Sequence, residues 1–274
     1  MAREQRDWYD TPLYYDIIFD ADTAKEGAFL EGVWERYGTG KKGRVLEAAC
    51  GSGRVMGEML RRGWKADGFD LNERMLGHAR ERLKGETGWK VWRGDLAGFE
   101  VPKGRRYEVV HCLVSTFKYV LSEAEAVAAL RRMGEALLPG GLVVLGLHLT
   151  DYGRKGCEHE RWVEARDGVE VVCNTRTWPA DRRTWSADRR TRLERVRARL
   201  KVTEGGVTRE QETVWNFRTY DARQLRALVG AVPELERVGC FDFQYDLGAP
   251  RKLDDGYADV ILVLRKVGAI SCLN

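Results

Sequence analysis

The 274-residue sequence contains little that would place it in a membrane, outside the cell or around a metal ion. Its best apolar run, Gly140 to Leu149, has the length of a strand, well short of the roughly 18 residues of a membrane-spanning helix. The charged segment 1–10 lacks an apolar core, so we expect no signal peptide. The six cysteines are scattered without a C-x-x-C pair. We therefore expect a cytoplasmic protein with reduced thiols and no bound metal.

A strong charge of either sign is also missing. The chain has 46 Lys and Arg against 42 Asp and Glu, which leaves a formal charge of +4. This balance argues against nucleic acid as the default partner, although it allows a local basic patch. A hydrophobic fraction of 43% with 32% charged residues predicts a folded core rather than a disordered chain.

The first half of the chain alternates strand-like and helix-like segments. The last of these strands, 142–149, is almost continuously apolar, as strands buried on both faces of a parallel sheet are. A helix over 123–138 should begin after Ser122 and end at Pro139-Gly140-Gly141. The pattern predicts an α/β fold with a doubly wound sheet whose first five strands cover 45–49, 65–71, 89–93, 107–114 and 142–149.

After Thr150 the pattern becomes antiparallel. Asp167-Gly168 and Gly205-Gly206 each stand between two β-like runs, which predicts two hairpins. We expect 151–220 to be an antiparallel β insertion over the active site. On this view 41–150 and 221–268 form the cofactor-binding α/β domain, and 1–40 form an N-terminal helical cap.

A glycine-containing turn follows the first strand, and acids follow its neighbours. Cys50-Gly51-Ser52-Gly53 comes directly after 45–49, and Glu47 lies inside that strand. Asp70 closes the second strand, and Asp95 follows the third. Ligands of open α/β sheets bind at the carboxyl ends of the strands, so one ligand should meet all three carboxylates.

The acids distinguish between two cofactors. A dinucleotide would place a pyrophosphate near Glu47, which would repel it, and Met56 stands where the third dinucleotide glycine is expected. S-adenosylmethionine instead offers an ammonium group, a ribose diol and an adenine, without phosphate. The residues therefore favour S-adenosylmethionine, and an NAD-dependent oxidoreductase is the least favoured alternative.

Four segments together resemble the class I S-adenosylmethionine-dependent methyltransferases. They are Val45 to Arg54, Asp70-Leu71-Asn72, Gly94-Asp95-Leu96 and Leu138-Pro139-Gly140-Gly141. The resemblance covers about 45–149. It implies a Rossmann-like seven-stranded sheet ending in a reversed hairpin, S-adenosyl-L-methionine as cofactor, S-adenosyl-L-homocysteine as product and no metal.

The resemblance also implies roles for individual residues. Glu47 would reach the methionine ammonium, Asp70 the ribose hydroxyls, and Asp95 the adenine amino group. Ala49 departs from the family pattern, which usually has its first glycine there. The remaining implied cofactor contacts are Gly51, Ser52 and Gly53 along the methionine, Leu71 and Met75 beside the adenine, Leu96 through its backbone, and Cys112 and Leu113 beneath the cofactor.

The segment Tyr9 to Asp16 resembles the one that precedes the core of many small-molecule N- and O-methyltransferases. There a tyrosine hydroxyl closes over the cofactor's carboxylate, and Tyr15 is the candidate here. The alternative is that these tyrosines only pack the first helix onto the sheet. Together with the β insertion, this segment favours the small-molecule branch of the family.

Candidate residues for contacting the methyl acceptor follow the fourth and fifth predicted strands. His148 ends the fifth strand and is the candidate base, with Tyr119 and Tyr152 as polar positioning groups. Thr116 is a candidate substrate contact, and Trp215 shares a strand face with Phe217 that would roof a pocket. Among the other histidines, His111 is expected in the core and His78 on a helix surface.

Residues 176–199 contain nine arginines against three acids. Hairpin pairing would use Arg199 with Glu212 and Lys201 with Glu210. We favour this pairing, while an anionic acceptor and, less so, a nucleic acid stay open as alternatives. The sequence thus predicts methyl transfer to a small-molecule nitrogen or oxygen nucleophile by a monomer or homodimer. An RNA or protein methyltransferase and a non-catalytic cofactor-binding module stay open as alternatives.

Overall fold

The computed structural model describes residues 4–179 and 189–267, and its main element is a seven-stranded sheet. The strand order is β11-β12-β6-β5-β2-β3-β4, with β12 antiparallel to both of its neighbours and the five strands from β6 to β4 parallel. The predicted doubly wound fold with a reversed final hairpin is therefore confirmed. The strands are β2 (Arg44–Ala48), β3 (Lys65–Asp70), β4 (Trp89–Arg93), β5 (Tyr107–Cys112), β6 (Leu137–His148), β11 (Leu235–Phe241) and β12 (Asp259–Lys266).

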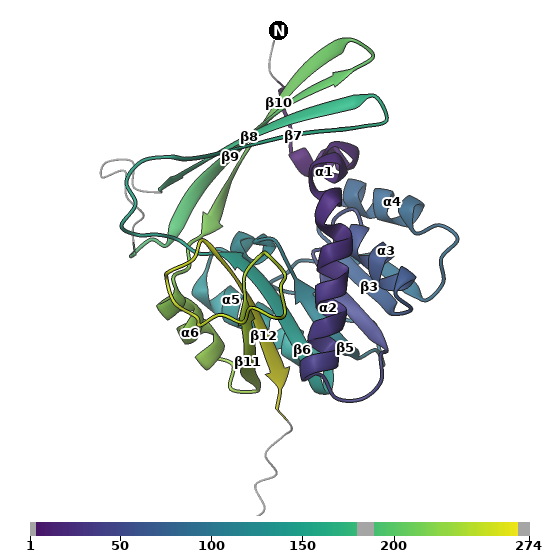
Figure 1. Cartoon of the computed structure of the whole chain (residues 1–274), viewed down its shortest axis with the longest axis vertical. Coiled ribbons are helices and arrows are strands. Elements are labelled where there is room, and N and C mark those ends of the chain that lie inside the picture. The colour runs from purple at the N-terminus through teal and green to yellow at the C-terminus, as the bar shows by residue number, and fades with distance from the viewer. Residues whose placement is uncertain (1–3, 180–188, 268–274) are drawn as a thin grey trace, which may run out of the picture.

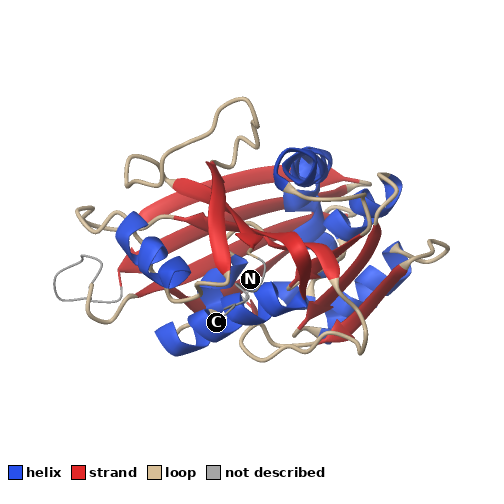
Figure 2. Cartoon of the chain, turned by 90° about the horizontal axis from the view of Figure 1, so that it is seen from below, coloured by secondary structure: helices blue, strands red, loops and turns tan. Residues whose placement is uncertain are grey.

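Helices cover both faces of this sheet (Figures 1 and 2). Alternate side chains of β6 show the two layers, since Leu142 and Val144 pack toward one set of helices while Val143 and Leu145 pack toward the other. Helices α2 (Thr23–Tyr37), α3 (Arg54–Arg61) and α4 (Glu73–Arg82) cover one face, and α5 (Glu123–Ala136) and α6 (Ala222–Gly230) cover the other. Helix α5 ends two residues before the predicted end because Leu137 pairs with Tyr107 of β5.

The insertion forms a second sheet that lies above the first in the view of Figure 1. Its strand order is β1-β10-β9-β8-β7, and both predicted hairpins are present. Gly205 and Gly206 both have positive φ, as a two-residue hairpin turn requires. The register places Lys201 opposite Glu210 and Arg199 opposite Glu212, as predicted. The strands are β1 (Glu4–Gln5), β7 (Glu158–Arg166), β8 (Val169–Pro179), β9 (Leu193–Glu204) and β10 (Val207–Arg218).

The N-terminal segment differs from the purely helical cap that we expected. It begins with β1, which pairs in parallel with β10 at the edge of the insertion sheet. The helical part follows as η1 (Trp8–Asp10), α1 (Pro12–Phe19) and η2 (Asp20–Asp22). Trp8, Ile17 and Ile18 pack on the inner face of the insertion sheet and build a third apolar cluster with it. The segment thereby joins the two sheets.

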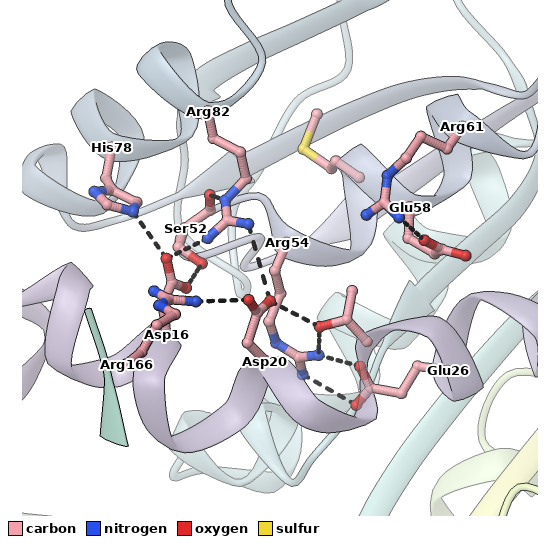
Figure 3. Close-up of polar contacts among 12 residues, drawn as sticks. Asp16, Asp20, Glu26, Ser52, Arg54, Glu58, Arg61, His78, Arg82 and Arg166 are labelled. Atoms are coloured by element: carbon pink, nitrogen blue, oxygen red, sulfur yellow. Dashed lines mark hydrogen bonds and ion pairs between the residues drawn. The ribbon is translucent and has the colours of Figure 1, made fainter. Parts of the chain in front are cut away.

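A buried carboxylate fixes this segment to the core, as Figure 3 shows. Asp16 of α1 is fully buried and accepts hydrogen bonds from Ser52 Oγ and from Arg82 of α4. His78 Nε2 lies 2.8 Å from Asp16 Oδ2, so His78 is not simply a surface residue. Burial opposes ionisation of Asp16, yet the His78 and Ser52 hydrogen bonds and the Arg82 charge hold its pKa below the usual value.

A second buried pair links α2 to the start of α3. Arg54 donates to both carboxylate oxygens of Glu26, with Nη2 3.0 Å from Oε1, and Nη1 also reaches Thr23 Oγ1 at 3.0 Å. Both side chains are nearly inaccessible to solvent. Each charge is therefore balanced almost entirely by the other.

We predict that Glu26→Gln lowers the free energy of unfolding by about 3–5 kcal/mol, because it leaves the buried Arg54 charge without a counter-charge. Urea unfolding followed by circular dichroism would measure the change. Glu31→Gln is the matched control, since Glu31 pairs with Lys42 and Arg62 near the surface and should contribute about 1 kcal/mol or less. Equal losses in the two variants would contradict the prediction.

Candidate functional site

A cavity of about 900 Å³ lies between the carboxyl ends of the seven-stranded sheet and the inner face of the insertion sheet. The strand ends contribute the loop after β5 and the residues after His148, and the insertion contributes alternate residues of β7 to β10. Six of the predicted site residues line it, namely Tyr15, Thr116, Tyr119, His148, Tyr152 and Trp215.

The glycine turn after β2 lies beside this cavity, at the same edge of the sheet. Gly51 and Gly53 have φ values of +52° and +72°, and Ala49 has +58°. Glycine is favoured in this left-handed region, which explains why the family pattern has a glycine at the position of Ala49. A Cβ on Gly53 would stand 3.0 Å from the Ala79 side chain, so α4 also packs closely here.

Asp70 holds the turn in place. The Gly51 N–H donates to Asp70 Oδ2 and the Asn72 N–H donates to Oδ1, both at 2.8 Å. Burial raises the pKa of Asp70, and these backbone hydrogen bonds oppose the rise. Each carboxylate oxygen has one backbone donor and a second lone pair, so the group retains the capacity to accept from a ligand diol.

The Glu47 side chain is half-buried at the start of helix α3. Its Oε2 accepts the Met56 N–H at 3.1 Å in the first turn of α3. Burial raises the pKa of Glu47 to about 8, and the nearby Arg54 charge opposes the rise. The side chain is thus a carboxyl group that a nearby cation would ionise.

Asp95 is the most open of the three acids. It follows β4, next to Gly94, whose N–H donates to the Asp70 backbone carbonyl at 3.0 Å. Its Oδ1 accepts the Ala97 N–H at 2.9 Å, and the residue is exposed. The structure therefore places the three acids at the ends of three neighbouring strands, with Glu47 half-buried and Asp95 at the surface.

The other predicted cofactor residues differ in exposure. Met75, Leu96, Cys112 and Leu113 are buried, whereas Leu71 is 55% exposed. The Ser52 hydroxyl is committed to Asp16, so it is not free for a ligand. The cofactor roles of these residues stay predictions.

Aromatic residues form the side of the cavity next to the N-terminal segment. Tyr15 packs between Trp8 and Phe19, at centroid distances of 5.7 and 4.6 Å. The hydroxyls of Tyr9 and Tyr119 are 2.8 Å apart, which gives Tyr119 a protein partner that the sequence did not reveal.

The loop after β5 presents Ser115 to His148. Val114 and Ser115 have φ values of +54° and +66°, a strained backbone typical of functional sites. Ser115 Oγ accepts the backbone N–H of His148 at 2.8 Å and lies 2.6 Å from its Nδ1. Burial and the Lys118 charge lower the pKa of His148 to about 4, so the ring is neutral near pH 7.

His111 lies in the core, as expected. It is fully buried within β5, and burial and the Arg54 charge lower the pKa of its ring to about 3. Both ring nitrogens lack a partner among the described residues.

Within residues 4–179 and 189–267, no three His, Cys, Asp or Glu side chains are grouped as metal ligands would be. The helices of these residues include none that combines the length and the apolar character needed to cross a membrane. Part of the arginine-rich stretch, 180–188 with Asp181, Trp185 and Asp188, lies outside the described residues.

Residues 45–141 match a family model described as a methyltransferase domain. Two curated relatives are N,N-dimethyltransferases. That of Streptomyces fradiae, named for dTDP-3-amino-3,6-dideoxy-alpha-D-glucopyranose, is 30% identical over 48% of this chain and 50% of its own. That of Streptomyces venezuelae, named for dTDP-3-amino-3,4,6-trideoxy-alpha-D-glucopyranose, is 33% identical over 48% of this chain and 54% of its own. The chain thus spans about half the length of these relatives.

Solved structures share the fold over nearly the whole chain. An S-adenosylmethionine-dependent methyltransferase from Clostridium acetobutylicum has a TM-score of 0.71 at 15% identity, covering 93% of this chain and 96% of its own. A sugar N-methyltransferase from Streptoalloteichus also has a TM-score of 0.71, at 18% identity, covering 98% and 96%. At these identities the likeness concerns the fold.

The raised pKa of Glu47 generates a pH prediction. Because the folded protein binds a proton here that the unfolded chain releases near pH 4.5, this group lowers stability as pH rises from about 4.5 to 8, by up to about 1.4 kcal/mol per pH unit. Glu47→Gln should therefore gain stability relative to the parent chain at pH 8.5 and not at pH 4.5. Urea unfolding at both pH values would test this, and an equal effect at both would show that Glu47 is not buried as a neutral acid.

Proposed function

We propose that the chain, whose residues 45–141 match a methyltransferase-domain model, transfers a methyl group from S-adenosylmethionine to a nitrogen of a small molecule. The observation that carries the proposal is the cavity, which is lined by the segments after β5 and β6 and by Arg54, the residue that directly follows the glycine turn. The relatives named as amino-sugar N,N-dimethyltransferases support nitrogen over oxygen.

The residues at the turn suit this cofactor. Asp70 keeps free acceptor capacity beside Gly51, as a ribose diol needs, and Glu47 is a half-buried acid with a raised pKa whose ionised form a neighbouring cation would stabilise. When bound, the cofactor supplies an electrophilic methyl group on a positively charged sulfur. The acceptor nitrogen lone pair forms the N–CH₃ bond, the C–S pair stays with sulfur, and the nitrogen releases one proton.

The protein contributes mainly by holding the acceptor in line with the methyl group and close to it. The aromatic side chains around Tyr119 and Trp215 enclose the acceptor end of the cavity.

The contact between Ser115 and His148 points to a positioning role for His148. Since Ser115 Oγ accepts the His148 backbone N–H, its own hydrogen is available for Nδ1, which leaves the hydrogen of the neutral ring on Nε2. In this form the proposed role of His148 is to donate a hydrogen bond from Nε2 to the acceptor, in place of the base role that the sequence suggests.

The RNA and protein alternatives receive less support. Arg176, Arg197 and Arg199 lie on the outer face of the insertion sheet, where they line a small groove with His159 and Asn174. The cavity is on the other face, lined by Thr175, Thr177 and Val196 of the same strands. A polyanion held by these arginines would not lie against the methyl donor.

Incubation with methyl-labelled S-adenosylmethionine and a panel of small amines and alcohols tests the proposed activity. Transfer of label to an amine is the expected result. Tight cofactor binding with no transfer to any amine would contradict it and favour a non-catalytic binding module.

Asp70→Ala should weaken S-adenosylmethionine binding by about 1.5–3 kcal/mol, roughly 10- to 100-fold in Kd, because it removes charged acceptors for the ribose. Isothermal titration measures the change. Glu73→Ala controls for the loss of a nearby surface charge, since Glu73 lies exposed on α4. Thermal unfolding of the variant checks that the turn survives without its hydrogen bonds to Asp70, and parent-like cofactor affinity would remove Asp70 from the site.

For the acceptor that the panel identifies, His148→Ala should lower kcat by about 100-fold at unchanged S-adenosylmethionine Kd, because a positioned hydrogen-bond donor is lost. Ser115→Ala should lower kcat less and leave the histidine free to change tautomer. His148→Gln, whose side-chain N–H can donate a hydrogen bond but which cannot take up a proton, should retain more of the rate than His148→Ala, and equal losses in the two variants would favour the base role.

A further inference from the structure

The charges around the cavity are strongly unequal. Ten carboxylates line it against four cationic side chains, among the residues that the structure describes. Each of the four cations is already in an ion pair with one of these carboxylates. The pairs are Arg54–Glu26, Lys118–Glu194, Arg154–Glu158 and Arg189–Asp221.

Six carboxylates remain. They make no ion pair within residues 4–179 and 189–267, and three of them accept only backbone N–H groups, from Gly153, Ala222 and Phe243. His148 is neutral near pH 7 and adds no positive charge. The six are Asp22, Asp151, Glu160, Glu164, Asp255 and Asp259.

The wall formed by β7 combines charge with aromatic surface. Glu160, Trp162 and Glu164 alternate along the strand, so all three project from its inner face into the cavity. Glu160 accepts from Thr175 Oγ1 at 3.2 Å, and Glu160 and Glu164 are both exposed, so a ligand can reach them. Trp215 and Phe217 of β10 face the same space. Carboxylates alternating with aromatic rings are the groups that bind an organic ammonium ion.

We propose, on the basis of the methyl transfer proposed above, that the acceptor is an amine that is positively charged at neutral pH and carries no phosphate. The wall of Glu160, Trp162 and Glu164 binds its charge and its apolar stem. The bound ammonium has no lone pair, so it loses one proton to water before the nitrogen attacks the methyl group. The methylated product is protonated in water as well, so the cavity carries the charge of both acceptor and product. This differs from the two relatives, whose names specify dTDP-sugars, because a diphosphate would meet the six carboxylates, with no free cation among the described residues that line the cavity.

A matched series of probes tests the charge preference. We would titrate 2-phenylethylamine, 2-phenylethanol and 2-phenylethyl phosphate into the chain saturated with S-adenosylhomocysteine, in low salt. The amine should bind at least about tenfold more tightly than the alcohol, and the phosphate should not bind. Binding of the phosphate, equal binding of amine and alcohol, or no binding of any probe would overturn the proposal.

Variants of the β7 wall test whether its carboxylates cause the preference for the amine over the alcohol. Glu160→Gln and Glu164→Gln should each reduce the amine-to-alcohol affinity ratio by roughly five- to tenfold while leaving the alcohol affinity unchanged. Glu170→Gln is the matched control, because Glu170 is exposed on β8 between the inward-facing Val169 and Val171. An amine preference that survives in both wall variants would show that β7 does not bind the charge.

The same samples separate this proposal from the proposed function. Amine binding without methyl transfer would contradict the methyltransferase activity and leave the charge assignment standing. Methyl transfer to an alcohol or a phosphorylated sugar, but to no amine, would overturn the charge assignment and leave the activity standing.

Discussion

The position of the cavity depends on one buried carboxylate, that of Asp16. It joins α1 to the glycine turn through Ser52 and to α4 through His78 and Arg82. Arg82 lies 3.9 Å from Asp20, which in turn accepts from Arg166 of β7 at 2.7 Å. A buried charge tolerates little displacement from its partners, because each loses compensation when it moves. The roof of the cavity is therefore fixed relative to the turn that is proposed to hold the cofactor.

Much of the α/β core could be predicted, because its signals are local. The apolar run 142–149, the glycine turn and the acids after successive strands each indicate structure within a few residues. The contacts of Asp16 could not be predicted in this way, since His78 is 62 residues away and reads as a polar residue on a helix. The pairing of β1 with β10 was missed for the same reason, because two residues of strand carry no pattern of their own.

The insertion shows that the amino-acid composition of a segment does not predict the charge of the ligand that it binds. Its arginines left an anionic partner open beside hairpin pairing, but strand alternation sorts the charges onto opposite faces. On β7, His159 faces outward while Glu158, Glu160 and Glu164 face the cavity. The net charge of a segment thus says little about a site when its two faces differ, and only a known sheet orientation tells which charges a ligand meets.

The parallel pairing of β1 with β10 bears on how the chain reaches its native state. Glu4 and Gln211 are register partners, and the Arg6 N–H donates to the Glu212 carbonyl at 3.1 Å, across more than two hundred residues. Contacts of such long sequence separation form late, because a large loop must close before they are gained. During synthesis on the ribosome, the enclosed cavity therefore cannot exist until the second hairpin has emerged, and nascent chains interrupted earlier would expose the inner aromatic surfaces to chaperones.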